Sequence, residues 1–158
     1  MIVDNFLSTD EFEKLKKDII SPYFPWYYQE GITNAGVYDD ACLLTHLFYD
    51  AGKKISPGFE IVEPLLKRLK IDELLRIKAN FYPNNAQYIE HGKHRDYEFS
   101  HKGLLFYINT NNGFTIIDND VKVESVVNRA FFFDPSILHQ STSCTDTKYR
   151  MNILINYR

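Results

Sequence analysis

Two histidines and one aspartate in the second half of the chain have the residue types and spacing of a metal site. His94 and Asp96 are two residues apart, and side chains at that spacing on an extended strand point to the same side. His139 could supply a third ligand from a distant segment. Two imidazoles and one carboxylate on one face of a metal leave the opposite positions open, an arrangement typical of non-haem Fe(II), whereas structural zinc prefers a closed, cysteine-rich set.

The sequence around these residues strengthens a signal that is weak by itself. About 0.7 histidine–acid pairs at this spacing are expected by chance from 21 acidic residues and 5 histidines in 158. However, His139 lies in AFFFDPSILHQS, an apolar strand followed by a turn with proline, and Arg150 opens the β-patterned segment RMNILINY. Alternation in that segment would also fit an ordinary surface strand. If both of its faces are buried, the guanidinium requires an anionic partner, and its planar fork suits a carboxylate.

The segment from about Ala79 to Arg158 resembles the 2-oxoglutarate and Fe(II)-dependent dioxygenases, most closely the prolyl 4-hydroxylase-like group. The matching stretches are NFYPNNAQYIEHGKHRDYE, GLLFYINTNNGFT, NRAFFFDPSILHQS and YRMNILINY. The resemblance implies that His94, Asp96 and His139 bind the iron. It also implies that Arg150 binds the distal carboxylate of 2-oxoglutarate, that O2 is consumed, and that ascorbate serves as a reductant.

Four further residues match co-substrate positions of such enzymes. Tyr82 and Tyr107 match tyrosines that line the co-substrate pocket, and Asn80 and Asn152 match an Asn-x-Tyr and an Arg-x-Asn of the alkylation-repair branch. One departure is Asn112-Gly113, which stands where many relatives carry Gly-Gly. We expect this departure to alter a turn and to leave the chemistry unchanged.

The resemblance implies an oxygenase that hydroxylates an unactivated C–H bond and releases succinate and CO2. The substrate favoured by the motifs is peptidyl proline or a related amino-acid side chain, in a peptide, a protein or a small amino-acid-like molecule. Because Asp96 is present, halogenation is disfavoured. Two alternatives stay open: oxidative demethylation of alkylated nucleic-acid bases, and a metal-binding jelly roll without catalysis.

Composition narrows the class of protein. A chain of 158 residues fits one domain, which we expect to span residues 1–158. The net charge of −3 gives no basic face for nucleic acid or anionic membrane, and no run of 18 apolar residues exists. Two cysteines, Cys42 and Cys144, and a start without a secretory signal predict a cytoplasmic protein in which both thiols are buried and reduced.

The periodicity predicts a mainly β fold with N-terminal helices. Ser8 is a suitable N-cap for a helix over 8–20, a second helix is expected over 58–70, and the aromatic, proline-containing stretch 21–31 is expected to be irregular. Strands are predicted near 74–82, 86–91, 103–109, 113–118, 121–127, 130–133 and 148–157. We therefore expect a jelly roll, or double-stranded β-helix, over about 73–158, with helical support over about 1–72 packed on the outer face of its major sheet.

Other polar and aromatic residues fit ordinary structural roles. His91 is three residues from His94 and would face the opposite side of a regular strand, so we do not expect it to bind the metal. Tyr88 fits substrate contact and plain packing equally well. For Arg129 a turn-stabilising role is favoured, and Arg95 must point away from the metal.

Overall fold

The structure of the protein is a computed structural model that describes residues 1–30, 42–84, 86–118 and 121–158. Within these ranges the chain is mainly β, as the sequence predicts. The helical elements are α1 (Thr9–Ile19), the 3-10 turn η1 (Phe59–Val62) and α2 (Glu63–Leu66). The strands are β1 (Ile2–Val3), β2 (Tyr27–Glu30), β3 (Cys42–Asp50), β4 (Lys53–Lys54), β5 (Leu74–Pro83), β6 (Lys102–Tyr107), β7 (Asn111–Ile117), β8 (Val121–Ser125), β9 (Arg129–Phe133), β10 (His139–Ser141) and β11 (Tyr149–Tyr157).

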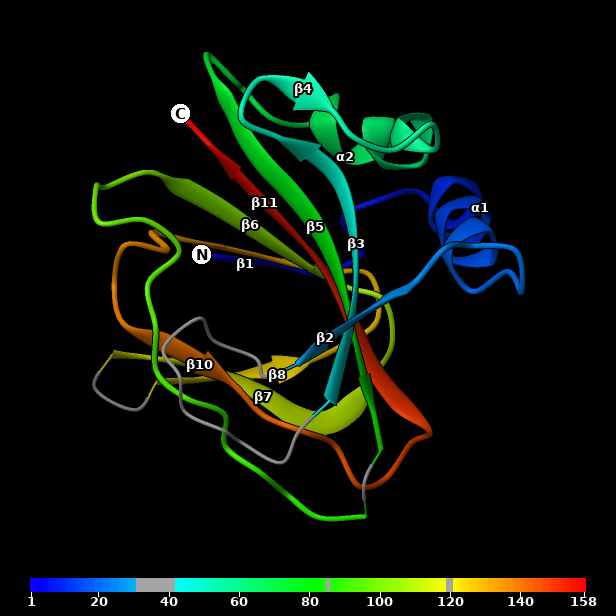
Figure 1. Cartoon of the computed structure of the whole chain (residues 1–158), viewed down its shortest axis with the longest axis vertical. Coiled ribbons are helices and arrows are strands. Elements are labelled where there is room, and N and C mark those ends of the chain that lie inside the picture. Colours follow the sequence, from blue (N-terminus) through cyan, green and yellow to red (C-terminus); the bar gives the residue numbers. More distant parts are fainter. Residues whose placement is uncertain (31–41, 85, 119–120) are drawn as a thin grey trace.

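The described strands form two antiparallel sheets that face each other. The large sheet has the order β1-β9-β6-β11-β5-β3-β2, with β4 paired to β3, and the small sheet has the order β10-β7-β8. Figure 1 shows helices α1 and α2 on one side of the large sheet and the small sheet on its other side. This is the predicted double-sheet jelly roll with helices on the outer face of the major sheet.

Strand β11 lies at the centre of the large sheet, and its two faces have different neighbours. Met151, Ile153 and Ile155 pack in the main core, against residues of α1 and α2 such as Leu15 and Leu65. Leu154 on the opposite face packs in a second cluster between the sheets. Because every residue from 150 to 157 is buried, the polar side chains on the inner face lie inside the protein. This burial is the condition under which Arg150 requires a partner.

Helix α1 begins where the sequence predicts. The Ser8 hydroxyl accepts a hydrogen bond from the Glu11 backbone N–H at 3.4 Å, and the Glu11 carboxylate accepts one from the Ser8 N–H at 3.0 Å, which completes a capping box. Arg68 donates to the same carboxylate at 2.6 Å. The cap is thereby connected to the segment that follows α2.

Two predicted elements differ from the structure. The helix expected over 58–70 is reduced to η1 and α2. Pro64 lies in the first turn of α2, where proline is tolerated, so it marks the start of a short helix and not the middle of a long one. After Leu66 the backbone N–H groups of Arg68 and Leu69 bond to carbonyls three positions back, and the α-helix ends. The strand expected over 86–91 is wrong, because this stretch contains only an isolated bridge between Glu90 and Thr142.

The predicted helical support also contains strands. β3 pairs with β5 along most of its length, and β2 pairs with β3, although residues 21–31 were expected to be irregular. Leu43 faces the interior between the sheets and Phe48 packs in the main core. The sequence of β3, CLLTHLFYD, has apolar residues on both faces and lacks the apolar–polar alternation that reveals half-buried strands, which explains why β3 was missed.

Cys144 is fully buried with a free thiol, as expected, whereas the side chain of Cys42 lies outside the described residues. In the described part of the chain, no helix has both the length and the apolar character needed to cross a membrane.

Candidate metal and co-substrate site

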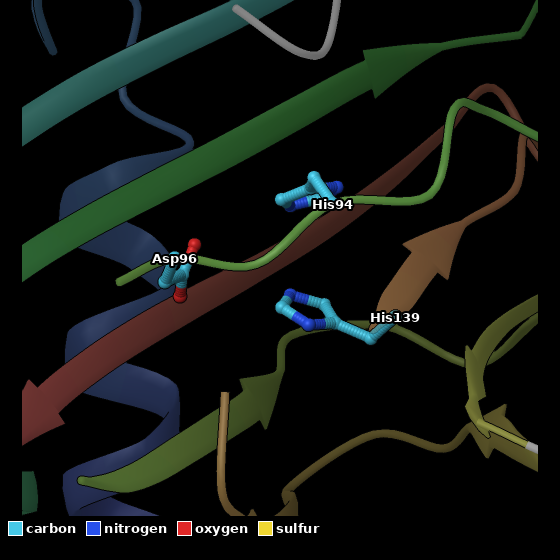
Figure 2. Close-up of side chains that lie close together, drawn as sticks. All are labelled: His94, Asp96 and His139. Carbon is cyan, nitrogen blue, oxygen red and sulfur yellow. The ribbon is translucent and has the colours of Figure 1, made fainter. Parts of the chain in front are cut away.

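His94, Asp96 and His139 lie together in the space between the two sheets. Their potential ligand atoms are all within 4.8 Å of one another, and no other described histidine, cysteine or acidic residue joins such a group. Figure 2 shows His94 and Asp96 on one segment and His139 entering from the start of β10. The segment with His94 and Asp96 lies outside the regular strands. A bridge holds it in place, since His94 and His139 exchange backbone hydrogen bonds of 2.9 and 3.0 Å.

Each imidazole is oriented by a backbone carbonyl. The Nδ1 atom of His94 is 3.2 Å from the Gly92 oxygen, and the Nδ1 atom of His139 is 2.9 Å from the Ile137 oxygen. A carbonyl only accepts, so Nδ1 is the donor in both contacts, which leaves the lone pair of a neutral ring on Nε2. Burial, followed by the charge of nearby His139, lowers the pKa of His94. A neutral ring with an available Nε2 is the form that binds a metal.

Asp96 is held by a residue that sequence reasoning missed. Burial alone would raise the pKa of Asp96, but the neighbouring Arg76 guanidinium and the two histidines lower it below its usual value. The Nη2 atom of Arg76 lies 2.8 Å from Oδ1 of Asp96. Oδ2 is buried and accepts no hydrogen bond from the described residues. The carboxylate is therefore ionised, with one oxygen paired and the other available.

Arg150 is fully buried on β11 and faces the same interior. Its Nε donates to Ser125 Oγ and its Nη2 to Thr115 Oγ1, both at 2.9 Å. Its guanidinium carbon lies 5.2 Å from the Tyr82 ring centre and 5.8 Å from that of Tyr107. No described carboxylate pairs with it, and Nη1 is buried without a hydrogen-bond partner. The site thus contains a desolvated cation whose anion is not part of the described protein.

The other predicted co-substrate residues lie near Arg150, in different positions. Tyr82 lines the cavity directly, whereas Tyr107 lies behind Thr115 and donates to its Oγ1 at 2.8 Å. Asn80 and Asn152 both line the cavity, and the Asn80 amide donates to the Asn152 oxygen at 2.9 Å. Of the predicted set, only Tyr107 is absent from the cavity wall.

One cavity connects the three potential metal ligands to Arg150. Its polar lining includes Lys78, Asn80, Tyr82, Thr115, Gln140, Ser141 and Asn152 in addition to His94, Asp96, His139 and Arg150, and its apolar lining is Leu43, Leu105, Phe133 and Leu154. Lys78 was also missed by sequence reasoning. The sequence does indicate its position, because Lys78, Asn80 and Tyr82 are every second residue of β5 and therefore share the face on which Asn80 and Tyr82 were predicted to line the site.

Gly113 lies beside Arg150 and not in a turn, which corrects the expectation for Asn112-Gly113. It belongs to β7, where the pairing with β8 shifts register between Asn111 and Phe114. A Cβ atom at Gly113 would lie 2.7 Å from Cδ of Arg150 and 2.8 Å from the backbone oxygen of Ser143. The absence of a side chain at this position makes room for the arginine.

Residues assigned ordinary roles lie outside the three-ligand group. His91 stacks on Tyr82 with ring centres 5.5 Å apart and contacts Ser141 Oγ at 2.8 Å through Nδ1. Tyr88 is 44% exposed and does not line the cavity. Arg129 pairs with Asp4 at 2.6 Å, beside β9, and thereby connects the N-terminal segment to the large sheet.

Comparison with known proteins gives matches in structure but not in sequence. No protein-family model and no curated protein matches the chain. A prolyl hydroxylase from Trichoplax adhaerens, solved in complex with a hypoxia inducible factor oxygen degradation domain peptide fragment, has a TM-score of 0.71 at 12% identity, over 99% of this chain and 82% of that chain.

Two further solved structures have similar scores. A 2OG-Fe(II) oxygenase family oxidoreductase from Burkholderia pseudomallei has a TM-score of 0.67 at 11% identity, over 99% of this chain and 82% of that chain. The non-haem α-ketoglutarate-dependent epimerase SnoN from nogalamycin biosynthesis has a TM-score of 0.68 at 10% identity, over 100% and 76% of the two chains. At these identities the likeness concerns the fold and not the reaction. The chain has the double-stranded β-helix fold of the 2-oxoglutarate and Fe(II)-dependent oxygenases.

Proposed function

We propose that the protein is a non-haem Fe(II) and 2-oxoglutarate-dependent oxygenase that hydroxylates an unactivated C–H bond. The observation that carries the proposal is the unpaired Nη1 of Arg150, a fully buried cation in the same cavity as His94, Asp96 and His139. A buried guanidinium without an anion is costly unless a ligand supplies the negative charge. A small dicarboxylate that reaches from the metal to Arg150 meets this requirement.

The donor set fits these two groups. His94, Asp96 and His139 would hold Fe(II), since two imidazoles and one carboxylate on one face leave positions open for a chelating co-substrate. Arg150 and the Thr115 hydroxyl would hold the distal carboxylate of 2-oxoglutarate, next to Tyr82. When bound, these groups supply the oxidation chemistry, in which O2 is consumed, succinate and CO2 are released and a hydroxyl group is added to the substrate.

The contribution of the chain is positioning and exclusion of water. The carbonyls of Gly92 and Ile137 fix the two imidazoles, and Arg76 fixes one oxygen of Asp96. Leu105, Phe133 and Leu154 form most of the apolar wall and limit access of water to the reacting centre.

For the substrate we propose peptidyl proline or a related amino-acid side chain. Support comes from the sequence motifs and from the fold shared with a prolyl hydroxylase that was solved with a peptide. The shared fold also includes an epimerase, so the fold alone does not select the reaction.

The test is succinate formation from 2-oxoglutarate with Fe(II), ascorbate and a library of proline-containing peptides and free amino acids. We expect substrate-dependent succinate release with the wild type and its loss in Asp96→Ala. Asp10→Ala is the matched control, since it removes an exposed carboxylate of the first turn of α1. Equal turnover by Asp96→Ala and the control would disprove the metal site. Metal binding without any use of 2-oxoglutarate would favour the non-catalytic binding module.

Oxidative demethylation of alkylated bases is the second candidate. The hydrogen-bonded pair Asn80 and Asn152 in the cavity favours it, because both match positions of the alkylation-repair branch. The net charge of −3 disfavours it, since nucleic-acid binding depends on cationic contacts to phosphates. Succinate formation with methylated single strands, inhibited steeply by salt, would support this candidate over the first.

A further inference from the structure

A second cation lines the cavity on the metal side. Lys78 and Arg150 are the only lysine or arginine side chains in the wall, within the described residues. Lys78 lies on β5, on the face that also presents Asn80 and Tyr82. The chemistry proposed above uses Arg150 but gives Lys78 no role.

Lys78 has no anionic partner in the described part of the protein. It forms no hydrogen bond and no ion pair there. Asp96 is the nearby carboxylate, but its Oδ1 pairs with Arg76 at 2.8 Å, and its Oδ2 is the oxygen left for a metal. Lys78 is half-buried in the cavity wall, and an ammonium in such a position is stabilised by an anion or by polar acceptors. A ligand that enters the cavity can supply them.

The register of the sheet separates Lys78 from the proposed 2-oxoglutarate anchor. Arg150 lies opposite Tyr82, whereas Lys78 lies opposite Leu154, four residues further along the same pair of strands. Four residues of strand span about 13 Å. This distance separates the backbone positions of the two cations, and the charged groups that act on the Lys78 ammonium are Arg76 and Asp96, at the metal end of the cavity. We therefore expect the anion of Lys78 to differ from the distal carboxylate bound by Arg150.

We infer that Lys78 binds a carboxylate of the primary substrate and thereby selects an acidic substrate. This inference rests on the proposed oxygenase function and narrows its substrate class. A free amino acid, a chain end or an acidic side chain each carries such a group. A carboxylate fits better than a phosphodiester backbone, because the cavity presents a single point charge here and the chain as a whole is acidic.

The test compares acids with their uncharged amides. Protein loaded with Mn(II) and saturating 2-oxoglutarate is titrated calorimetrically with proline, leucine, lysine and glutamate and with the carboxamide of each. N-acetyl-proline represents a chain end, N-acetyl-prolinamide an internal residue, and a blocked peptide with one glutamate represents an acidic side chain. A single-stranded oligonucleotide supplies phosphodiesters. The variants are Lys78→Met, which keeps length and removes charge, and Lys102→Met, a control at an exposed position of the same sheet.

We expect at least one acid to bind the wild type at least tenfold more tightly than its amide. In Lys78→Met this ratio should fall to about one to two, while Lys102→Met keeps it, and the Kd values for Mn(II) and 2-oxoglutarate should change less than threefold in both. Thermal unfolding verifies that both variants fold.

Three results would overturn the inference: equal binding of acids and amides by the wild type, binding of no acid by protein that holds Mn(II) and 2-oxoglutarate, or tight binding of the oligonucleotide alone. An increase of the 2-oxoglutarate Kd in Lys78→Met as large as in Arg150→Met would also overturn it, because Lys78 would then belong to the co-substrate site. Failure of the proposed function gives a different result, since wild-type protein would not bind 2-oxoglutarate at all.

Discussion

The guanidinium of Arg76 lies 2.8 Å from Oδ1 of Asp96, so a neighbouring strand fixes one of the three potential metal ligands. The guanidinium also lies over the Tyr97 ring, 5.4 Å from its centre. Because the pair occupies only one carboxylate oxygen, it is compatible with metal binding through the other. Residues that hold a metal ligand in this way influence affinity without touching the metal.

The first prediction follows from this ion pair. Arg76→Met should weaken Fe(II) or Mn(II) binding by about 10- to 100-fold, the usual effect of removing a group that orients a metal ligand. Arg68→Met is the control, because it removes a partly exposed ion pair with Glu11, away from the site. Metal affinity is measured by calorimetry under anaerobic conditions. An affinity for metal in Arg76→Met that equals or exceeds the wild-type value would show that the pair does not support the ligand.

The second prediction concerns the co-substrate. Arg150→Met should raise the Kd for 2-oxoglutarate at least about 30-fold, since loss of one partner of a buried charge pair costs about 2–5 kcal/mol. The metal Kd should change little, because Arg150 forms no ion pair with Asp96 and is not among the charged groups that shift its pKa. Arg129→Met removes a surface pair with Asp4 and serves as control. Unchanged 2-oxoglutarate affinity in Arg150→Met would exclude this arginine as the anchor.

The third prediction tests the space around Arg150. Gly113→Ala places a methyl group 2.7 Å from Cδ of Arg150 and 2.8 Å from a backbone oxygen. It should destabilise the fold by about 1–3 kcal/mol, typical of overpacking, and weaken 2-oxoglutarate binding. In Gly58→Ala the new methyl group meets the flexible end of Ile61 at 3.2 Å and Ser56 Oγ at an ordinary contact distance of 3.5 Å, so a smaller effect is expected. Equal unfolding free energies and co-substrate affinities in both variants would contradict the prediction.

The fourth prediction is a pH dependence of stability. Burial, followed by the positive charge of Arg150 and the electrostatic influence of His94, lowers the pKa of His91 to about 3. Between an unfolded value near 6.5 and this folded value, only the unfolded chain binds the proton, so acid favours unfolding. The free energy of unfolding should therefore fall as pH decreases from about 6.5 towards 3, by at most about 1.4 kcal/mol per pH unit from this residue.

Denaturant unfolding of the wild type and His91→Gln in EDTA measures this effect without contributions from bound metal. His94 also has a lowered pKa and acts in the same direction, so the difference between the two proteins isolates His91. The two stability curves should converge as pH decreases. If they stay parallel from pH 7 to pH 4, the depressed pKa of His91 is refuted.

Local sequence patterns predicted much of the fold. Ser8 and Glu11 mark the start of α1, the alternation in β11 identifies that strand and its faces, and β5 was predicted as a strand near 74–82. These signals depend on residues close together in the chain, which is why they can be recognised without a structure. β3 and the stretch 86–91 were mispredicted for the converse reason. β3 has apolar residues on both faces and shows no alternation, and the 86–91 stretch pairs too briefly with its neighbours to form a strand.

The sequence alone determined which side chains were available for chemistry. His94, Asp96, His139 and Arg150 were recognised by type, spacing and context, although their roles as ligands stay predictions. Only the tertiary structure decided what surrounds them. Pairing between distant strands brings Arg76 to Asp96, and it brings Thr115 and Ser125 to Arg150. It also sets the separation of Lys78 from Arg150 along the sheet. Such contacts result from register and packing of the whole sheet, which no local pattern specifies.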